Sequence, residues 1–274
     1  IATKTGMSLS DYVVTEAGFG SDLGAEKFMD IKCQSAGLSP KVIVLVATVR
    51  ALKYHGGADP KNLTFPNQDA VRRGLCNLEK HLENSRLFGI PAVVAVNRFT
   101  SDTPDELDVI VNRCEELGFR AIISGVWAKG GEGAESLAHA VVETIEAGNG
   151  QFHPLYDWSW SIQEKIKTIA TKIYGAAEVE YTPKARLDLK RITKLGMDGA
   201  AVCIAKTQKS LSDNPDLIGR PSGFNITVRE IEIAAGAGFV VPITGDIMRM
   251  PGLPEVPSAE NIDIDGEGNI SGLF

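Results

Sequence analysis

The chain has 274 residues, of which 43% are hydrophobic and 23% charged, and this composition is typical of a globular protein with one large or two modest domains. The formal net charge of -7 argues against nucleic acid or an anionic membrane as the main partner, although a local basic pocket could still bind phosphate. We find no run of about 18 apolar residues and no signal peptide, so neither a membrane span nor secretion is expected.

Four cysteines are widely spaced and form no CxxC or Cys/His pattern: Cys33, Cys76, Cys114 and Cys203. We expect buried free thiols in a reducing compartment, and therefore a cytoplasmic protein with neither a disulfide framework nor a metal site. The chain begins with Ile1 rather than methionine. We interpret this start as a sign that the sequence is part of a longer polypeptide.

Four strands are predicted in the first half of the chain. The first is the short apolar run Tyr12–Val14, which stops at Thr15-Glu16 before a glycine turn. "VIVLVATV" (42–49) and "PAVVAVN" (91–97) are continuous β-branched runs, which is typical of strands buried on both faces. "RAIISGVW" (120–127) is a weaker run of the same kind.

Helical patterns separate these strands. Residues 69–89 carry apolar side chains at helical spacing and end at a glycine, and residues 133–150 form a similar helix with a glycine stop. Between them, the segment 103–118 starts with Thr103 as N-cap and with Glu106 completing a capping box. Strands that alternate with helices predict an α/β fold, a parallel sheet with crossover helices, whose ligands bind beyond the carboxyl ends of the strands.

Those carboxyl ends are rich in glycines, cations and aromatic residues. Phe19 lies in the glycine turn that follows the first strand, and Arg50, Lys53 and His55 follow the second. The third strand ends at 97–99, and the fourth leads into "WAKGGEG". We therefore expect Phe19 on a ligand-facing rim, where glycine backbone can approach an anion.

The plainer interpretation of the same residues stays open. Glycine-rich turns after strands usually only make turns, and rim phenylalanines more often cap a core. Lys129 and Lys206, taken singly, are typical surface residues. Of the histidines, only His55 lies at the predicted rim, whereas His81 and His139 lie within helices and are expected to be structural.

The second half has a different character. Residues 151–161 look like a linker or domain entry, and two amphipathic helices follow over 161–175 and 182–196. Short strands are predicted over 200–207, 225–235 and 238–245. The alternation in "TVREIEI" predicts one solvent-facing side and a mixed or antiparallel sheet. We therefore predict two domains, an α/β domain over 1–150 and a smaller α+β domain over 151–274.

The chain contains no GxGxxG, GxxxxGK[ST] or GxSxG motif. Composition and pattern alone lead only to an α/β ligand-binding protein with an anionic substrate.

Several longer segments are more informative than composition and pattern. They include "TEAGFGSDLGAEKF", "NLEKHLENSRLFGIPAVVAVNRFTSDT", "GRPSGF" and "NIDIDGEGNISGLF". They resemble the formate–tetrahydrofolate ligase family over essentially the whole chain. The resemblance implies the C-terminal half of an enzyme that joins formate to tetrahydrofolate with ATP through formyl phosphate. It also implies a nucleotide-binding P-loop in an upstream half, Mg-bound ATP, a homotetramer and a role for a monovalent cation.

Site residues follow from the same resemblance. Phe99 and Trp127, with Ile123 beside them, match the positions that sandwich the folate pterin ring. Phe19, Gly20 and Arg50 match the catalytic region around formyl phosphate. Candidates for the nucleotide side are Lys206, Arg220 and Pro221. The chain departs from the family at two positions, with Ser21 where a smaller residue is usual and Thr100 where a homologue has proline.

Two functions stay open at this point. The chain is either the C-terminal part of an active ligase or a stand-alone folate-binding or assembly module without catalysis. The match that runs to the last residues favours the ligase.

Overall fold

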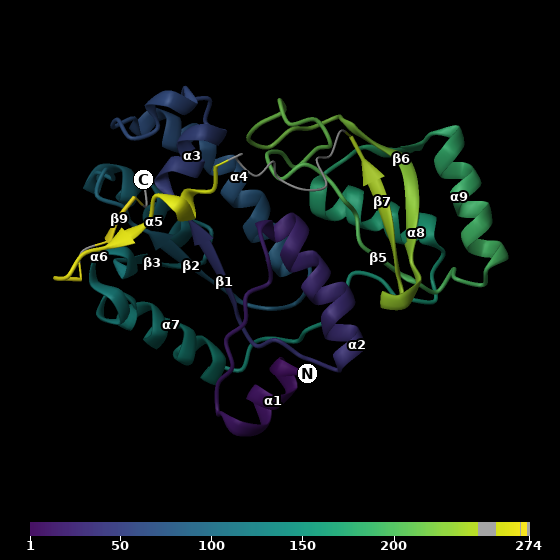
Figure 1. The fold of residues 1–274 in the computed structure, drawn as a ribbon, viewed down its shortest axis with the longest axis horizontal. Helices are drawn as coiled ribbons and strands as arrows, with labels where there is room; N and C mark the ends of the chain where they lie inside the picture. Colours follow the sequence, from purple (N-terminus) through teal and green to yellow (C-terminus); the bar gives the residue numbers. More distant parts are fainter. Residues whose placement is uncertain (246–255, 269, 273–274) are drawn as a thin grey trace.

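The structure is a computed structural model that describes residues 1–245, 256–268 and 270–272. Figure 1 shows two sheets at opposite sides of the molecule, with the long helix α4 (Gln68–Arg86) and the helical segment that ends in α2 (Gln34–Ala36) between them. Three short elements lie outside both sheets and their helices: the exposed helix α1 (Ala2–Leu9), the turn η7 (Ser258–Glu260) and the short hairpin of β8 (Asp263–Ile264) and β9 (Ile270–Ser271). In the described part of the chain, no helix is long and apolar enough to cross a membrane.

The first sheet is parallel, as predicted. Its order is β1 (Ile43–Ala47), β2 (Ala92–Asn97) and β3 (Arg120–Ser124). The crossovers contain α3 (Val49–His55), α4 and α5 (Pro104–Glu116), and α7 (Glu135–Glu146) follows β3. The central strand β2 is buried on both faces up to its last residue, which its run of valines and alanines predicts.

Two expectations about this sheet were wrong. Residues 12–14 form no strand, and Val14 is 90% exposed, because this three-residue run finds no neighbouring strand with which to pair. Strand β1 is the edge of the described sheet, and it is not buried on both faces, since Val46 is 63% exposed. The helices α4 and α5 cover one face of the sheet, whereas α7 packs against β2 and β3 on the opposite face.

The helix boundaries follow the predicted caps. Thr103 Oγ1 accepts a hydrogen bond from Glu106 N at 3.4 Å, while Glu106 Oε2 accepts one from Thr103 N at 3.1 Å, so the capping box that begins α5 is present. Helices α5 and α7 end before Gly118 (φ 76°) and Gly148 (φ 68°), which take the left-handed conformation.

A buried ion pair ties α3 to α5. Lys53 Nζ lies 2.6 Å from Glu106 Oε1 and donates to the carbonyls of Leu63 (3.3 Å) and Phe65 (2.9 Å), next to the short turn η3 (Pro60–Asn62). Burial raises the pKa of Glu106, but hydrogen bonds from Asn67 N and Lys53 outweigh it and lower that pKa overall. Lys53 is thus fully buried and does not lie at the rim, where the sequence pattern placed it.

The second sheet is mixed, as the alternation predicted. Its order is β4 (Glu178–Tyr181), β6 (Asn225–Ala234), β7 (Phe239–Thr244) and β5 (Ala201–Val202). Strands β6 and β7 are antiparallel, joined through the turn η6 (Ala235–Ala237), and the outer two pairs are parallel. The predicted helices are α8 (Ile162–Thr168), continued by η5 (Ile169–Tyr174), and α9 (Pro183–Lys194).

The hydrophobic core of the second sheet reaches back into the first half of the chain. Met29 and Cys33 of η2 (Phe28–Cys33) are buried in it, together with Phe88 and Ile90, which precede β2. The domain boundary at residue 150 therefore stays a prediction. All four cysteines are free; Cys33 and Cys114 are buried as expected, and the other two are half-buried.

Polar contacts join α4 to the second half. Asn77 Nδ2 donates to Gly219 O at 2.9 Å, Lys80 Nζ to Lys172 O at 2.6 Å, and Asn84 Nδ2 to Ile173 O at 3.0 Å. The three side chains recur at spacings of three and four, so they share one face of the helix. Helix α4 thereby serves as one wall for both halves of the molecule.

Candidate functional site

Two aromatic side chains meet at the carboxyl ends of β2 and β3. The ring centroids of Phe99 and Trp127 are 6.3 Å apart, with an angle of 51° between the ring planes. Trp127 is 61% exposed. The two rings therefore form a tilted pair, here called the aromatic V, in which Trp127 is exposed and Phe99 is half-buried.

The backbone of Phe99 is fixed by hydrogen bonds with Asp102. Its backbone N–H donates to Asp102 Oδ2 at 2.8 Å, and Asp102 N donates back to Phe99 O at 3.1 Å, so the strand ends in a tight turn. The Arg50 guanidinium lies 5.1 Å from the centre of the Phe99 ring and its Nη2 is 3.5 Å from Ser101 Oγ. Ile123, paired with Val96 at the end of β3, is 40% exposed.

Trp127 lies in a closed loop. It belongs to the short helix α6 (Val126–Lys129), whereas the sequence pattern placed it in the strand. Gly125 N donates to Gly133 O at 2.9 Å, and a Cβ on Gly133 would lie 2.4 Å from the backbone of Gly125. The glycines of this loop, including those of η4 (Gly130–Ala134), thus let its two ends touch.

The glycine turn carries Phe19 on its outside. Phe19 is 75% exposed and lies between Gly18 (φ 86°) and Gly20 (φ 73°), just before η1 (Gly20–Ala25). A Cβ on Gly24 would lie 2.5 Å from Ala17 O, so the turn packs against its own helix. Phe19 is exposed as expected, although the turn follows irregular chain rather than a strand.

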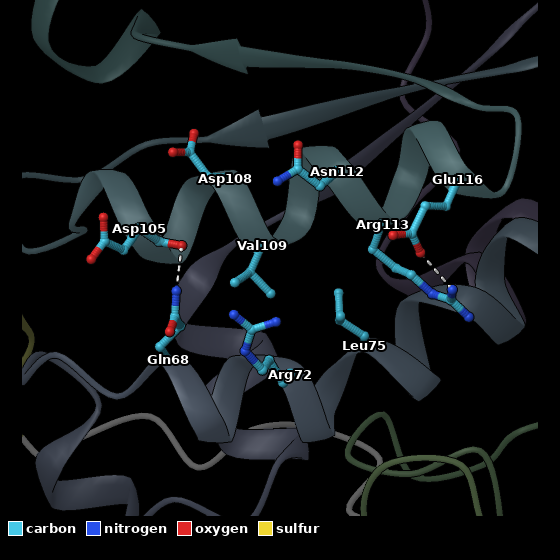
Figure 2. Close-up of a pocket in the computed structure, with 9 residues that line it drawn as sticks. All are labelled: Gln68, Arg72, Leu75, Asp105, Asp108, Val109, Asn112, Arg113 and Glu116. Atoms are coloured by element: carbon cyan, nitrogen blue, oxygen red, sulfur yellow. Dashed lines mark hydrogen bonds and ion pairs between the residues drawn. The ribbon is translucent and has the colours of Figure 1, made fainter.

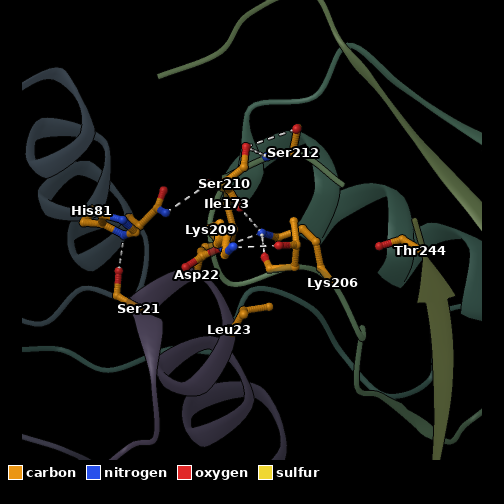
Figure 3. A network of polar contacts seen from close by, with 12 residues as sticks. Ser21, Asp22, Leu23, His81, Ile173, Lys206, Lys209, Ser210, Ser212 and Thr244 are labelled. Carbon is orange, nitrogen blue, oxygen red and sulfur yellow. Dashed lines mark hydrogen bonds and ion pairs between the residues drawn. The ribbon is translucent and has the colours of Figure 1, made fainter. Parts of the chain in front are cut away.

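Two polar contacts hold the residues that follow this turn, as Figure 3 shows. Ser21 Oγ lies 2.5 Å from His81 Nδ1 on α4, and Asp22 Oδ2 lies 3.0 Å from Lys206 Nζ. Burial lowers the pKa of the Lys206 ammonium, which Asp22 partly opposes, and burial also lowers the pKa of His81. Lys206 also donates to the carbonyls of Thr207, at 2.9 Å, and of Ser210.

The structure places the three nucleotide candidates in two places. Lys206 is buried against Asp22, whereas Arg220 is 38% exposed and makes two hydrogen bonds to Glu83 on α4, at 2.8 and 2.7 Å. Pro221, next to Arg220, is half-buried. The same loop docks through Gly219 N, which donates to His55 Nδ1 at 3.1 Å, and burial lowers the pKa of His55 to about 4.

A buried carboxyl pair follows the turn. Glu26 and Asp30 are both 0% exposed, and Asp30 Oδ1 accepts from Leu155 N at 2.7 Å. The other three carboxyl oxygens of the pair have no hydrogen-bond donor in the described residues. Burial, with the Asp30 charge adding to it, raises the pKa of Glu26 well above its usual range, and burial raises that of Asp30 to about 7. Both shifts favour the protonated, neutral form of these carboxyl groups.

A separate groove of about 300 Å³ lies between α4 and α5 (Figure 2). Its lining includes Gln68, Arg72, Asp105 and Asp108, and Gln68 Nε2 bridges the helices to Asp105 O at 3.3 Å. None of the site residues named above lines it. Within residues 1–245, 256–268 and 270–272, no group of three or more His, Cys, Asp or Glu side chains is arranged to hold a metal ion.

Of the predicted site residues, the structure brings Arg50, Phe99 and Trp127 together. It also links the residues after the glycine turn to Lys206 through Asp22. Sequence reasoning missed Asp102 and His81. Asp102 had a weak local signal, since aspartate is enriched in turns, where its side chain bonds to nearby backbone. The contact of His81 with Ser21 had none, because 60 residues separate them.

The chain was compared with protein-family models. The model described as "Formate--tetrahydrofolate ligase" matches residues 1–274. The match covers the aromatic V, the glycine turn and both sheets.

Proposed function

Because the chain belongs to the formate–tetrahydrofolate ligase family, whose substrates include ATP and tetrahydrofolate, we propose that it supplies the folate site of such a ligase. In this proposal the enzyme joins formate to tetrahydrofolate through formyl phosphate, and the chain is its C-terminal half. The observation that supports this best is the pair of exposed Trp127 and half-buried Phe99, which lies beside a cation at the ends of parallel strands.

The aromatic V fits a flat heterocycle. A ring between two others needs faces about 7 Å apart, since each contact between carbon atoms takes about 3.5 Å. The present centroids are 6.3 Å apart and the planes are tilted by 51°. Trp127 therefore has to turn toward a parallel arrangement, which its exposure and its separate loop allow, while Phe99 stays fixed by Asp102. Ile123 supplies an apolar edge to the same space.

The chemistry requires two transfers. A formate oxygen attacks the γ-phosphorus of ATP and ADP leaves, which gives formyl phosphate. The folate N10 then attacks the formyl carbon, phosphate leaves with the bonding electrons, and the amine loses its proton. Each step develops negative charge on phosphate oxygens, and the second needs the amine held in place.

We assign the positive charge near the folate to Arg50. Its guanidinium already lies over Phe99, so it can contact an anion while keeping its stacking on the ring. We place Phe19 and Gly20 at the wall where the formyl group meets the folate. Gly18 and Gly20 have positive φ, which glycine adopts readily, and because they carry no Cβ the backbone can approach the formyl group there.

For the nucleotide side we propose Arg220 and Pro221, because the Arg220 guanidinium is accessible and only paired with a partly exposed carboxylate. Lys206 would have to leave Asp22 and two carbonyls to reach a phosphate. We propose that a P-loop half holds Mg-bound ATP and packs on the open face of β1 at Val44 and Val46. A homotetramer and activation by a monovalent cation complete the proposal.

The test is Trp127→Ala, made in the polypeptide that includes the P-loop half. Loss of one stacking face costs about 1 kcal/mol, so the KM for tetrahydrofolate should rise about fivefold or more while the KM for ATP changes little. Trp160→Ala is the matched control, since Trp160 is also partly exposed, at 41%. Unchanged folate kinetics in Trp127→Ala would refute the folate site.

The isolated chain separates the two candidate functions. We expect no formate-dependent ADP formation from residues 1–274 alone, because the sequence holds no P-loop motif for the phosphates. A chain that binds folate but gains no ligase activity when the P-loop half is supplied would favour the non-catalytic module.

A further inference from the structure

The glycine turn is held from two sides by side chains from distant parts of the chain. On one side, Ser21 Oγ lies 2.5 Å from His81 Nδ1 of α4. On the other, Asp22 is paired with the fully buried Lys206. Figure 3 shows the start of η1 between α4 and the 206–212 loop, with both contacts in view.

His81 and Lys206 differ in the hydrogen-bond partners that hold their side chains. Lys206 has further partners in the carbonyls of Thr207 and Ser210, so its position does not depend on the turn. The side chain of His81 contacts Ser21, the residue directly after Gly20.

The turn itself leaves Phe19 free to move unless its neighbours are fixed. Gly18 and Gly20 both have positive φ, and glycine has the widest backbone freedom of any residue. The Phe19 side chain is 75% exposed, so it makes little packing of its own that would fix its direction. A hydrogen bond at residue 21 therefore adds to the contacts of Asp22 and Gly24 in fixing where the wall of the site stands.

We propose that His81 is a positioning residue, which sets the direction of Phe19 by binding Ser21. This inference rests on the proposed function, because it assumes that Phe19 borders the folate. His81 touches no reacting atom in this account. Burial lowers the pKa of His81, and the nearby Lys206 and Lys80 act in the same direction against Asp22, so the imidazole is neutral when it binds the serine hydroxyl.

Steady-state kinetics test the proposal in the polypeptide that includes the P-loop half. Loss of one hydrogen bond of typical strength should raise the KM for tetrahydrofolate about fivefold in His81→Ala, with the KM for ATP changed less than about twofold. Ser21→Ala should have the same effect, and the double variant should be no worse than either single one. His81→Asn, which keeps an acceptor near the same place, should recover part of the loss.

Hydrogen exchange gives a second measurement that does not depend on turnover. In His81→Ala, the amides of residues 19–24 should exchange faster, including Gly24 N, which donates to Phe19 O at 3.2 Å. The control is His139→Ala, whose side chain is 72% exposed on α7, and it should change neither the KM values nor exchange in the turn.

Three results overturn the proposal. One is an equal rise of both KM values with no change of exchange in the turn, which would make His81 merely structural. Another is a silent Ser21→Ala beside a damaging His81→Ala, which would show that the serine is not the link. The third is wild-type turnover with unchanged folate KM in all variants. Absence of any formate- and folate-dependent ADP formation by the wild type would instead overturn the proposed function itself.

Discussion

Replacing Glu26 with glutamine should stabilise the protein more at high pH than at low pH. The pKa of Asp30 is raised by burial from 3.8 to about 7, and that of Glu26 is raised by burial and by Asp30. Between the unfolded and the folded pKa of Asp30, the folded protein binds more protons than the unfolded chain. The protein therefore loses stability as pH rises from about 4 to about 7. Glutamine at position 26 removes one titration and gives Asp30 a neutral amide donor.

The magnitude follows from the size of the Asp30 shift. A shift of about three units, at 1.36 kcal/mol each, corresponds to about 4 kcal/mol across the window as an upper bound. Burial, and not Glu26, causes the Asp30 shift, so the gain of the variant comes from removing the Glu26 titration, which Asp30 also raises. With half of the Asp30 bound taken as the size of this effect, the variant gains about 2 kcal/mol on the wild type between about pH 5 and about pH 8. At 2–4 °C for each kcal/mol, the difference in Tm should grow by roughly 4–8 °C.

The assay is thermal unfolding of wild type and variant side by side, because the difference between them isolates the pair. His55 acts in the opposite direction, since burial lowers its pKa to about 4 and stability then rises with pH up to about 6.5. Glu178→Gln, at an exposed position on β4, is the control. A Tm difference that stays flat from about pH 5 to about pH 8 would refute the raised pKa of Glu26 beside Asp30.

Gly133→Ala should weaken folate binding several-fold at unchanged ATP affinity, since its Cβ would meet Gly125 backbone at 2.4 Å and displace the loop that carries Trp127. Gly131→Ala, where the new Cβ meets no atom within 4 Å, should have no such effect, and equal results from the two in a fluorescence titration would count against the closed loop. Lys53→Met should destabilise the protein by about 3–5 kcal/mol, because Glu106 is left as an unpaired buried charge. Adding Glu106→Gln should recover part of that loss in urea unfolding, and a further drop would show that the pair is not the cause. Residues 1–274 expressed alone should aggregate or melt without cooperativity, because Val44 and Val46 leave apolar surface open beside an edge strand, and a monodisperse chain in light scattering would contradict this.

Local signals predicted the elements that depend on neighbouring residues. The capping box at Thr103 and Glu106 and the glycine stops at 118 and 148 determine helix ends within a few positions, so pattern alone located α5 and α7. The buried run of β2 was equally clear. The alternation in β6 correctly predicted a mixed sheet.

Positions that depend on distant partners were not predictable in this way. Tyr12–Val14 has the composition of a strand but no strand to pair with. Lys53 looked like a rim cation, yet its partner Glu106 lies 53 residues further along the chain and buries it. For the site, the resemblance supplied Phe99 and Trp127, and the structure adds that they meet; the roles of the remaining site residues stay predictions.

The shared core around η2 also constrains the order in which the chain can fold during synthesis. Met29 and Cys33 are buried among side chains such as Ile166, Val202 and Val240, which the ribosome adds much later. At 5–20 residues per second, the apolar side of η2 waits on the order of 10–40 s for its last partners. During that time its apolar side chains lack their partners while the β-branched β2 emerges, so we expect this stage of synthesis to be the one most exposed to aggregation.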